Sequence, residues 1–113
     1  MFSRSQPEIR RVVRQLTLLN QHGLHARPAT QLVRCASEFE SSITIKSNGK
    51  QFRADRIMEV LLANLNHGDT FIIEAIGTDA IQAVERIARL IVLLKEAEET
   101  ARTFRNAIDE VVD

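Results

Sequence analysis

Residues 20–29 read Asn-Gln-His-Gly-Leu-His-Ala-Arg-Pro-Ala and join two segments with different hydrophobic periods. In front of them, residues 12–19 alternate, with Leu16 and Leu18 facing one way, which predicts a strand. Behind them, residues 26–38 carry apolar side chains at the i, i+3, i+4 and i+7 spacing of an amphipathic helix, namely Ala29, Leu32, Val33 and Ala36. The stretch therefore predicts a turn that connects a strand to a helix.

The second histidine of this stretch lies where the predicted helix begins. Pro28 is tolerated only in the first turn of a helix, so the N-cap falls between His25 and Arg27. A helix N-terminus disfavours imidazolium, and the neutral ring is the nucleophilic form of histidine. The backbone N–H groups of Ala26 and Arg27, together with the Arg27 guanidinium, would bind the oxygens of a phosphoryl group. The pattern indicates a reversible phosphoryl acceptor.

The middle of the chain predicts a β-hairpin followed by a short helix. Residues 43–46 alternate, Asn48-Gly49 is a hairpin turn signal, and a second strand runs to about Arg53. Asp55 then stands in position to cap a helix. The apolar residues of that helix are Ile57, Met58, Leu61 and Leu62. Sequence alone does not sort these four side chains into core and surface.

The last third of the chain predicts a strand and a long helical stretch. Residues 70–76 form the strand, and Asp79 with Gln82 resembles a capping box that opens the next helix. The element order is therefore β-α-β-β-α-β-α, an α+β fold. No glycine or proline follows Gly77, and apolar residues recur at spacings of three and four at Ile87, Leu90, Leu94, Ala97, Ala101, Phe104, Ile108 and Val111. The stretch is either one helix or two helices with a break near residues 98–100.

The apolar seam at the end of the chain needs a cover. It either pairs with a second copy, giving a homodimer through the C-terminal helix, or folds back on the domain beside Phe2 and Ile9. Ala97 and Ala101 would allow two helices to approach closely. We favour self-association.

Composition limits the classes of function. The chain has 113 residues, 44% hydrophobic and 27% charged, which is typical of one globular domain. Its formal net charge is zero, so no global field favours nucleic acid or a membrane surface. No apolar run approaches the ~20 residues of a membrane span, and we expect no membrane insertion. A single cysteine, Cys35, and the lack of a secretory signal predict a cytoplasmic protein.

Two further hypotheses are weaker. His22 and His25 have a spacing that two metal ligands could use, but no cysteine or carboxylate accompanies them, so we expect no metal and no cofactor. The β-α-β-β-α-β order is also that of an RNA-recognition module, which needs aromatic side chains on its central strands. The chain has five Phe and neither Tyr nor Trp, so we expect no nucleic-acid partner.

Residues 23–29, Gly-Leu-His-Ala-Arg-Pro-Ala, resemble the active-site motif of HPr, the histidine-containing phosphocarrier family of the bacterial phosphoenolpyruvate-dependent sugar phosphotransferase system. The resemblance covers residues 12–95 without a gap. Further matching positions are Phe39, residues 43–45, residues 47–50, Ile57, Met58, Gly68, Asp69 and residues 75–79. Residues 1–11 lie outside it as a loose leader, and residues 96–113 as a C-terminal helical extension.

The resemblance implies both a fold and a reaction. The fold is an open-faced sandwich, a four-stranded antiparallel sheet with three helices on one face. Enzyme I passes a phosphoryl group from phosphoenolpyruvate to Nδ1 of His25, and a sugar-specific enzyme IIA receives it. The protein would be a covalent carrier in this relay rather than an enzyme. Docking would use the first helix and the short second helix, at Thr30, Gln31, Arg34, Arg56, Ile57, Met58 and Leu61.

One position departs from the family pattern. Many Gram-positive members carry a regulatory serine where this chain has Arg56, so we expect no serine phosphorylation there. Two alternatives stay open beside the sugar carrier, a regulatory paralogue of the nitrogen-type branch and a docking module without phosphotransfer. His25 and Arg27 are both intact, which argues against the docking module but does not separate the two carriers.

Overall fold

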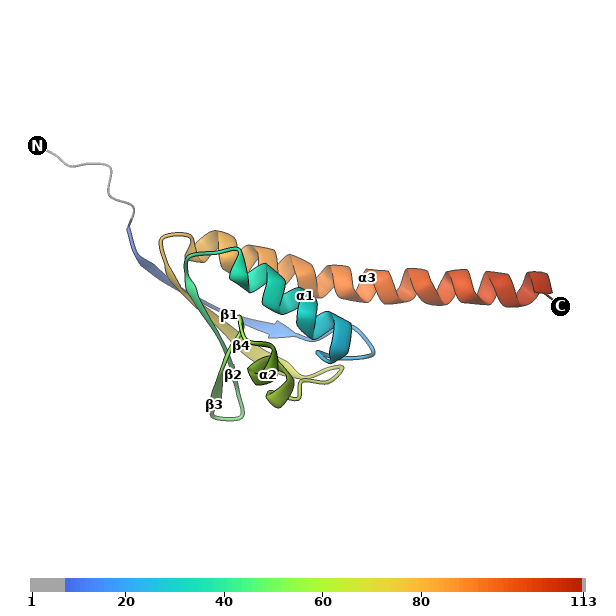
Figure 1. Ribbon diagram of the computed structural model, residues 1–113, viewed down its shortest axis with the longest axis horizontal. Helices are drawn as coiled ribbons and strands as arrows, with labels where there is room; N and C mark the ends of the chain where they lie inside the picture. Colours follow the sequence, from blue (N-terminus) through green and yellow to red (C-terminus); the bar gives the residue numbers. More distant parts are fainter. Residues whose placement is uncertain (1–7, 113) are drawn as a thin grey trace, which may run out of the picture.

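The computed structural model describes residues 8–112 (Figure 1). Its elements follow the predicted order and are β1 (Arg10–Thr17), α1 (Ala26–Ser37), β2 (Ser42–Ser47), β3 (Lys50–Arg53), α2 (Ile57–Leu62), β4 (Thr70–Gly77) and α3 (Ala80–Val112). Within this part of the chain, no helix has the length and apolarity to cross a bilayer. The prediction of an α+β fold is confirmed.

The four strands form one antiparallel sheet in the order β1-β4-β2-β3. One face of β4 is buried through Phe71, Ile73 and Ala75, because alternate residues of a strand point to the same face. The helices cover that face, and Figure 1 shows α1 and α3 running side by side over the sheet. The core lies between the two layers and includes Leu32 of α1 and Ile87 of α3. The predicted open-faced sandwich is therefore present.

The first strand begins earlier than expected. Arg10 and Arg11 pair with Gly77 and Ile76 of β4, so residues 10 and 11 belong to the sheet and the predicted loose leader is too long. The guanidinium of Arg11 also pairs with the buried carboxylate of Glu74 on β4. The alternation of apolar and polar residues could not reveal this start. Two consecutive arginines show no such alternation, although they belong to a strand. Phe2, which the fold-back hypothesis places beside the C-terminal tail, lies outside the described residues.

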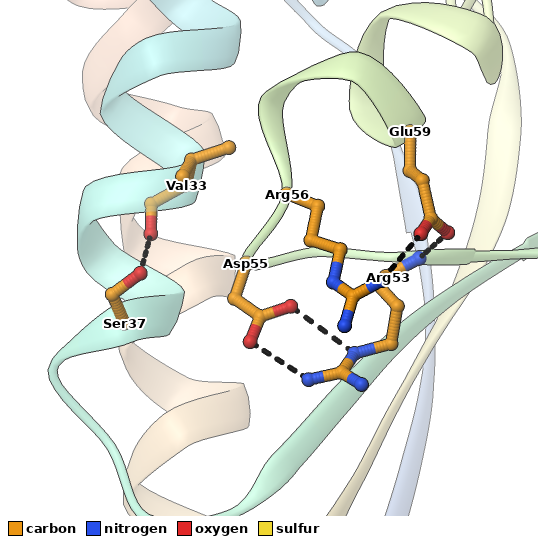
Figure 2. Close-up of polar contacts among 6 residues, drawn as sticks. All are labelled: Val33, Ser37, Arg53, Asp55, Arg56 and Glu59. Carbon is orange, nitrogen blue, oxygen red and sulfur yellow. Dashed lines mark hydrogen bonds and ion pairs between the residues drawn. The ribbon is translucent and has the colours of Figure 1, made fainter.

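The start of α2 differs from the predicted Asp55 cap. Arg56 is the N-cap and its side chain makes no capping hydrogen bond. The Asp55 carboxylate instead accepts two hydrogen bonds from the Arg53 guanidinium, at 3.1 and 2.8 Å (Figure 2). Glu59, in the first turn, accepts a hydrogen bond from the backbone N–H of Arg53 at 2.8 Å. The Arg53 guanidinium therefore binds Asp55 in place of the helix N-terminus, and Glu59 ties the first turn of α2 to the end of β3.

Asp79 precedes α3 as expected, but its carboxylate reaches away from Gln82. It accepts hydrogen bonds from the backbone N–H groups of Glu40 and Ser41, each at 2.9 Å, and from the Ser41 hydroxyl. These bonds join the start of α3 to the loop that connects α1 to β2. Gln82 is exposed. The predicted capping box is therefore replaced by a contact between two distant segments.

The last third of the chain contains one unbroken helix after β4. α3 is a single helix of 33 residues, about 50 Å long, and it projects past the rest of the fold (Figure 1). Its first half is buried through Val84, Ile87 and Ile91. From residue 99 to residue 110 every side chain is exposed, Phe104 to 66%. The described part of the tail thus does not fold back on the domain.

Candidate functional site

His25 is the N-cap residue of α1 and is extended, with φ −122° and ψ 159°. Ala26, which follows it, has a φ of 47°, in the left-handed region that non-glycine residues rarely adopt. The His25 side chain makes no capping hydrogen bond, which leaves the first N–H groups of the helix available to a ligand. The structure therefore brings His25, Ala26 and Arg27 together at a helix N-terminus, within the interval that the sequence left open.

A hydrogen bond to Asn66 orients the His25 ring. Nε2 lies 2.9 Å from Oδ1 of Asn66, which follows α2. Because an amide oxygen only accepts, this contact favours the neutral tautomer with the proton on Nε2 and the lone pair on Nδ1. The amide of Asn66 is held in this sense because Nδ2 donates to the carbonyl of Asn64 at 3.2 Å. Sequence reasoning missed Asn66, which lies 41 residues along the chain from His25 and carries no local signal.

The loop that leads to His25 rests on the same segment. The backbone N–H of Leu24 donates to the carbonyl of Leu65 at 2.9 Å, and both side chains are buried. Gly23, with a φ of +67°, lies so close that an added Cβ would be 2.6 Å from this carbonyl oxygen. Glycine is needed here for its conformation and for its size. The loop is thereby pressed against residues 64–66.

Arg27 is exposed, and within residues 8–112 no carboxylate forms an ion pair with it. It borders a groove of about 520 Å³ whose walls come from the start of α1 and from α3. The α1 side holds His25, Pro28 and Gln31, and the α3 side is lined by Leu94, Ala97, Glu98 and Ala101. An anion held beside His25 would thus meet an unpaired guanidinium and a helix N-terminus.

The residues expected to dock partners lie on two helices that pack together, α1 and α2. Thr30, Gln31 and Arg34 are exposed on α1. On α2, Met58 is 66% exposed, whereas Leu61 is half-buried. The side chain that α2 buries fully is Val60, which the sequence analysis had not placed among the helix's apolar residues. Ile57 and Leu62 are exposed, and Arg56 forms an ion pair with Glu59 at 3.6 Å.

The other two histidines are more exposed than His25. His22 is exposed, and its Nδ1 lies 3.0 Å from Oε2 of Glu98 on α3. His67 is exposed in the loop before β4. Across residues 8–112, no group of three or more His, Cys, Asp or Glu side chains could hold a metal ion.

Comparisons with known proteins agree on one family. Residues 12–92 match the family PTS-HPr, described as the PTS HPr component phosphorylation site. Phosphocarrier protein HPr of Mycoplasma capricolum is 43% identical over 70 residues, 62% of this chain and 79% of the relative. Phosphocarrier protein NPr of Shewanella violacea is 38% identical over 78 residues, 69% of this chain and 86% of the relative.

Solved structures repeat this result at the level of the fold. A crystal structure of a phosphocarrier protein HPr from Bacillus anthracis matches with a TM-score of 0.69 and 31% identity, over 71% of this chain and 95% of that one. An HPr dimer from Thermoanaerobacter tengcongensis matches with a TM-score of 0.52 and 30% identity, over 74% of this chain and 91% of that one.

Proposed function

The chain belongs to the HPr family, the phosphocarriers of the phosphotransferase system, and on this basis we propose that His25 is the residue that carries its phosphoryl group. Nδ1 of the neutral ring attacks the phosphorus atom of a phosphohistidine on enzyme I. The new N–P bond forms as the old one breaks. Transfer to enzyme IIA reverses these roles. The protein is then a covalent carrier that two other proteins use as acceptor and donor.

The observation that carries the proposal is the 2.9 Å bond between His25 Nε2 and Asn66 Oδ1. Asn66 Oδ1 accepts the proton of Nε2–H in this bond, which favours the tautomer protonated on Nε2 and leaves Nδ1 as the nucleophile. During attack the ring becomes cationic, and a hydrogen bond from a charged donor is stronger than one from a neutral donor. Asn66 therefore favours both the reactive tautomer and the charge that develops on it.

Arg27 and the start of α1 hold the phosphoryl group in this proposal. The backbone N–H groups of Ala26 and Arg27 donate to its oxygens, and the exposed guanidinium of Arg27 adds a charge-assisted contact. These contacts remain in water, so they stabilise the phosphorylated form only modestly. A carrier needs this balance because it must release the group to the next protein.

Enzyme I and enzyme IIA are the proposed partners, and the proposed docking surface consists of Thr30, Gln31, Arg34, Arg56, Ile57, Met58 and Leu61. Exposed apolar side chains on α2 beside arginines suit a transient contact with steering charges. Arg56 offers no hydroxyl, so we propose that no serine kinase regulates this position. We assign residues 10–95 to the carrier domain, residues 96–112 to a helical extension, and the protein to the cytoplasm.

The test is phosphorylation of the full chain with enzyme I and labelled phosphoenolpyruvate. We expect an acid-labile, base-stable label on the wild type and on His22→Ala and His67→Ala, but none on His25→Ala. Arg27→Ala should fold normally and accept the label more slowly, since the lost contact is worth at most about 1.5–3 kcal/mol. Equal labelling of His25→Ala would refute the assignment.

A regulatory carrier of the nitrogen-type branch is the second candidate, because the NPr of Shewanella violacea is 38% identical to this chain. The same assay separates the two when it is run with a sugar-type and with a nitrogen-type enzyme I. Faster labelling by the sugar-type enzyme supports the sugar carrier. Faster labelling by the nitrogen-type enzyme assigns the chain to the regulatory branch.

A further inference from the structure

Glu98 lies on α3 beyond residues 12–92, the part that matches the family, and its carboxylate reaches back to the loop before His25. Oε1 accepts a hydrogen bond from the backbone N–H of Gln21 at 2.6 Å. Oε2 accepts from Nδ2 of Asn20 at 2.9 Å and from the backbone N–H of His22 at 3.4 Å. The ring Nδ1 of His22 lies 3.0 Å from the same oxygen.

These contacts are built into the fold rather than spread over its surface. The side chain of Glu98 is only 18% exposed, and Asn20 is buried. Burial raises the pKa of Glu98, but hydrogen bonds from Asn20, His22 and the backbone of Gln21 and His22 outweigh it, so the pKa is lowered. The carboxylate is therefore charged at neutral pH, and charged acceptors form the stronger hydrogen bonds.

The contacts pass directly into the phosphoacceptor loop. Nδ2 of Asn20, which donates to Glu98, also donates to the carbonyl of Gly23 at 3.0 Å. On the other side, the loop is held by the hydrogen bond from Leu24 to Leu65 and by the contact of His25 with Asn66. α3 thus binds the first half of the loop, and residues 64–66 bind its second half. Without Glu98 only one of the two attachments would remain.

We propose that Glu98 is a positioning residue for phosphotransfer, which fixes residues 20–22 and through them the place and orientation of His25. The proposal rests on the assignment of His25 as the phosphoacceptor. It makes α3 past residue 92 a part of the phosphoacceptor site rather than an appendage. A reacting group that shifts by about 1 Å can lose about a hundredfold in rate, so small displacements of this loop matter.

The experiment compares Glu98→Ala, Glu98→Gln and Glu96→Ala in the full chain. Glu96 is exposed and, two residues away, lies on the opposite side of the same helix, so its removal controls for lost charge and for helix propensity. Initial rates of His25 phosphorylation by enzyme I are measured over a range of carrier concentrations. Amide NMR reports on Gln21 and His22, and thermal unfolding gives the folded fraction of each variant.

We expect Glu98→Ala to lower kcat between about tenfold and about a hundredfold while KM changes little, because a misplaced nucleophile still docks. The amide signals of Gln21 and His22 should move. Glu98→Gln keeps one oxygen acceptor and should recover part of the rate. Glu96→Ala should match the wild type.

A wild-type kcat for folded Glu98→Ala would overturn the positioning role, as would a loss that disappears once the rate is corrected for the folded fraction. An equal loss in Glu96→Ala would assign the effect to charge on the helix instead. Glu98→Gln, which keeps the size of the side chain, maintains the test if the alanine variant unfolds. Failure of the underlying assignment looks different, because the wild type would then carry no label on His25.

Discussion

The loop before His25 and the end of α3 owe their conformations to different kinds of interaction. Residues 20–25 have no regular structure, yet Asn20 and Leu24 are buried and two other segments, α3 and residues 64–66, bind the loop. Residues 99–110 form regular helix, yet every side chain there is exposed. Long-range contacts therefore determine the conformation of the loop, whereas local helix propensity determines that of the tail. Substitutions should be costly in the first region and nearly silent in the second.

The largest expected effect is that of Gly23→Ala. Alanine is strained in the left-handed backbone conformation of this position, and its Cβ would lie 2.6 Å from the Leu65 carbonyl oxygen. We expect a loss of about 3 kcal/mol in the free energy of unfolding, together with slower phosphorylation, since the loop must move. Urea unfolding measures the first quantity.

Gly49→Ala is the matched control, because Gly49 has a φ of +76° and nothing lies within 4 Å of its added Cβ. It should lose only the conformational term, about 1–2 kcal/mol, and phosphorylate at the wild-type rate. Equal losses in the two variants would show that the loop is not pressed against residues 64–66.

Asn66→Ala should act on the rate rather than on the fold. It removes the acceptor for Nε2 of His25, so the proton becomes free to move to Nδ1. We expect phosphorylation to slow about tenfold, equivalent to about 1.4 kcal/mol, which is within the range for a typical hydrogen bond. Asn66→Asp retains an acceptor oxygen and should keep the Nε2-protonated tautomer, as read by ¹⁵N NMR of the ring. An unchanged tautomer in Asn66→Ala would remove Asn66 from the mechanism.

Asp79→Asn should make stability less sensitive to acid. A hydrogen bond from Ser41 is the main cause that holds the pKa of Asp79 below its usual value of 3.8, against the opposing effect of burial. A carboxyl whose pKa is lower in the folded state stabilises the fold above its unfolded pKa, and this contribution is lost as the pH falls through the folded pKa. The gap in unfolding free energy between wild type and variant should therefore be largest above about pH 4 and narrow below it.

The control is Asp109→Asn in the exposed tail, which should leave the unfolding free energy unchanged across the same pH range. A gap for Asp79→Asn that stays constant down to acid pH would mean that the Ser41 contact contributes nothing through ionisation.

The smallest effect on phosphotransfer is expected from Phe104→Glu. Phe104 and Ile108 are exposed on α3, and we expect them to be buried between two copies of the chain. Light scattering should then report a dimer for the wild type and a monomer for the variant, while both are phosphorylated at the same rate. A monomeric wild type at high micromolar concentration would eliminate the homodimer. Slower phosphorylation of Phe104→Glu would show that the tail does contribute to phosphotransfer.

The sequence predicts the parts of the site that are local. Residues 23–29 place His25 and Arg27 at the start of a helix through proline chemistry and helical period, and the structure has the helix there. The same holds for the strands, because alternation predicts most of their ends to within about two residues. Residues close together in sequence interact in ways that spacing rules describe.

What the sequence does not predict is the set of contacts between distant segments. Asn66 and Glu98 reach the phosphoacceptor loop from 41 and 77 residues away, and each is an ordinary polar residue within its own element. Asp55 and Asp79 were read as local helix caps, but Arg53 and Ser41 bind them instead. A carboxylate has several donors within reach in a folded chain, and spacing cannot rank them.

The central claim is that Nδ1 of His25 carries the phosphoryl group, and the ring nitrogens can be read directly. The full chain, labelled with ¹⁵N at its histidines, is phosphorylated by enzyme I and phosphoenolpyruvate, and the nitrogen that bonds to phosphorus is identified by ¹⁵N NMR. The account predicts a phosphorus-coupled Nδ1 on His25, with unmodified rings at His22 and His67. Phosphate on Nε2 of His25, the nitrogen that donates its hydrogen bond to Asn66, or on either of the other histidines would contradict the assignment.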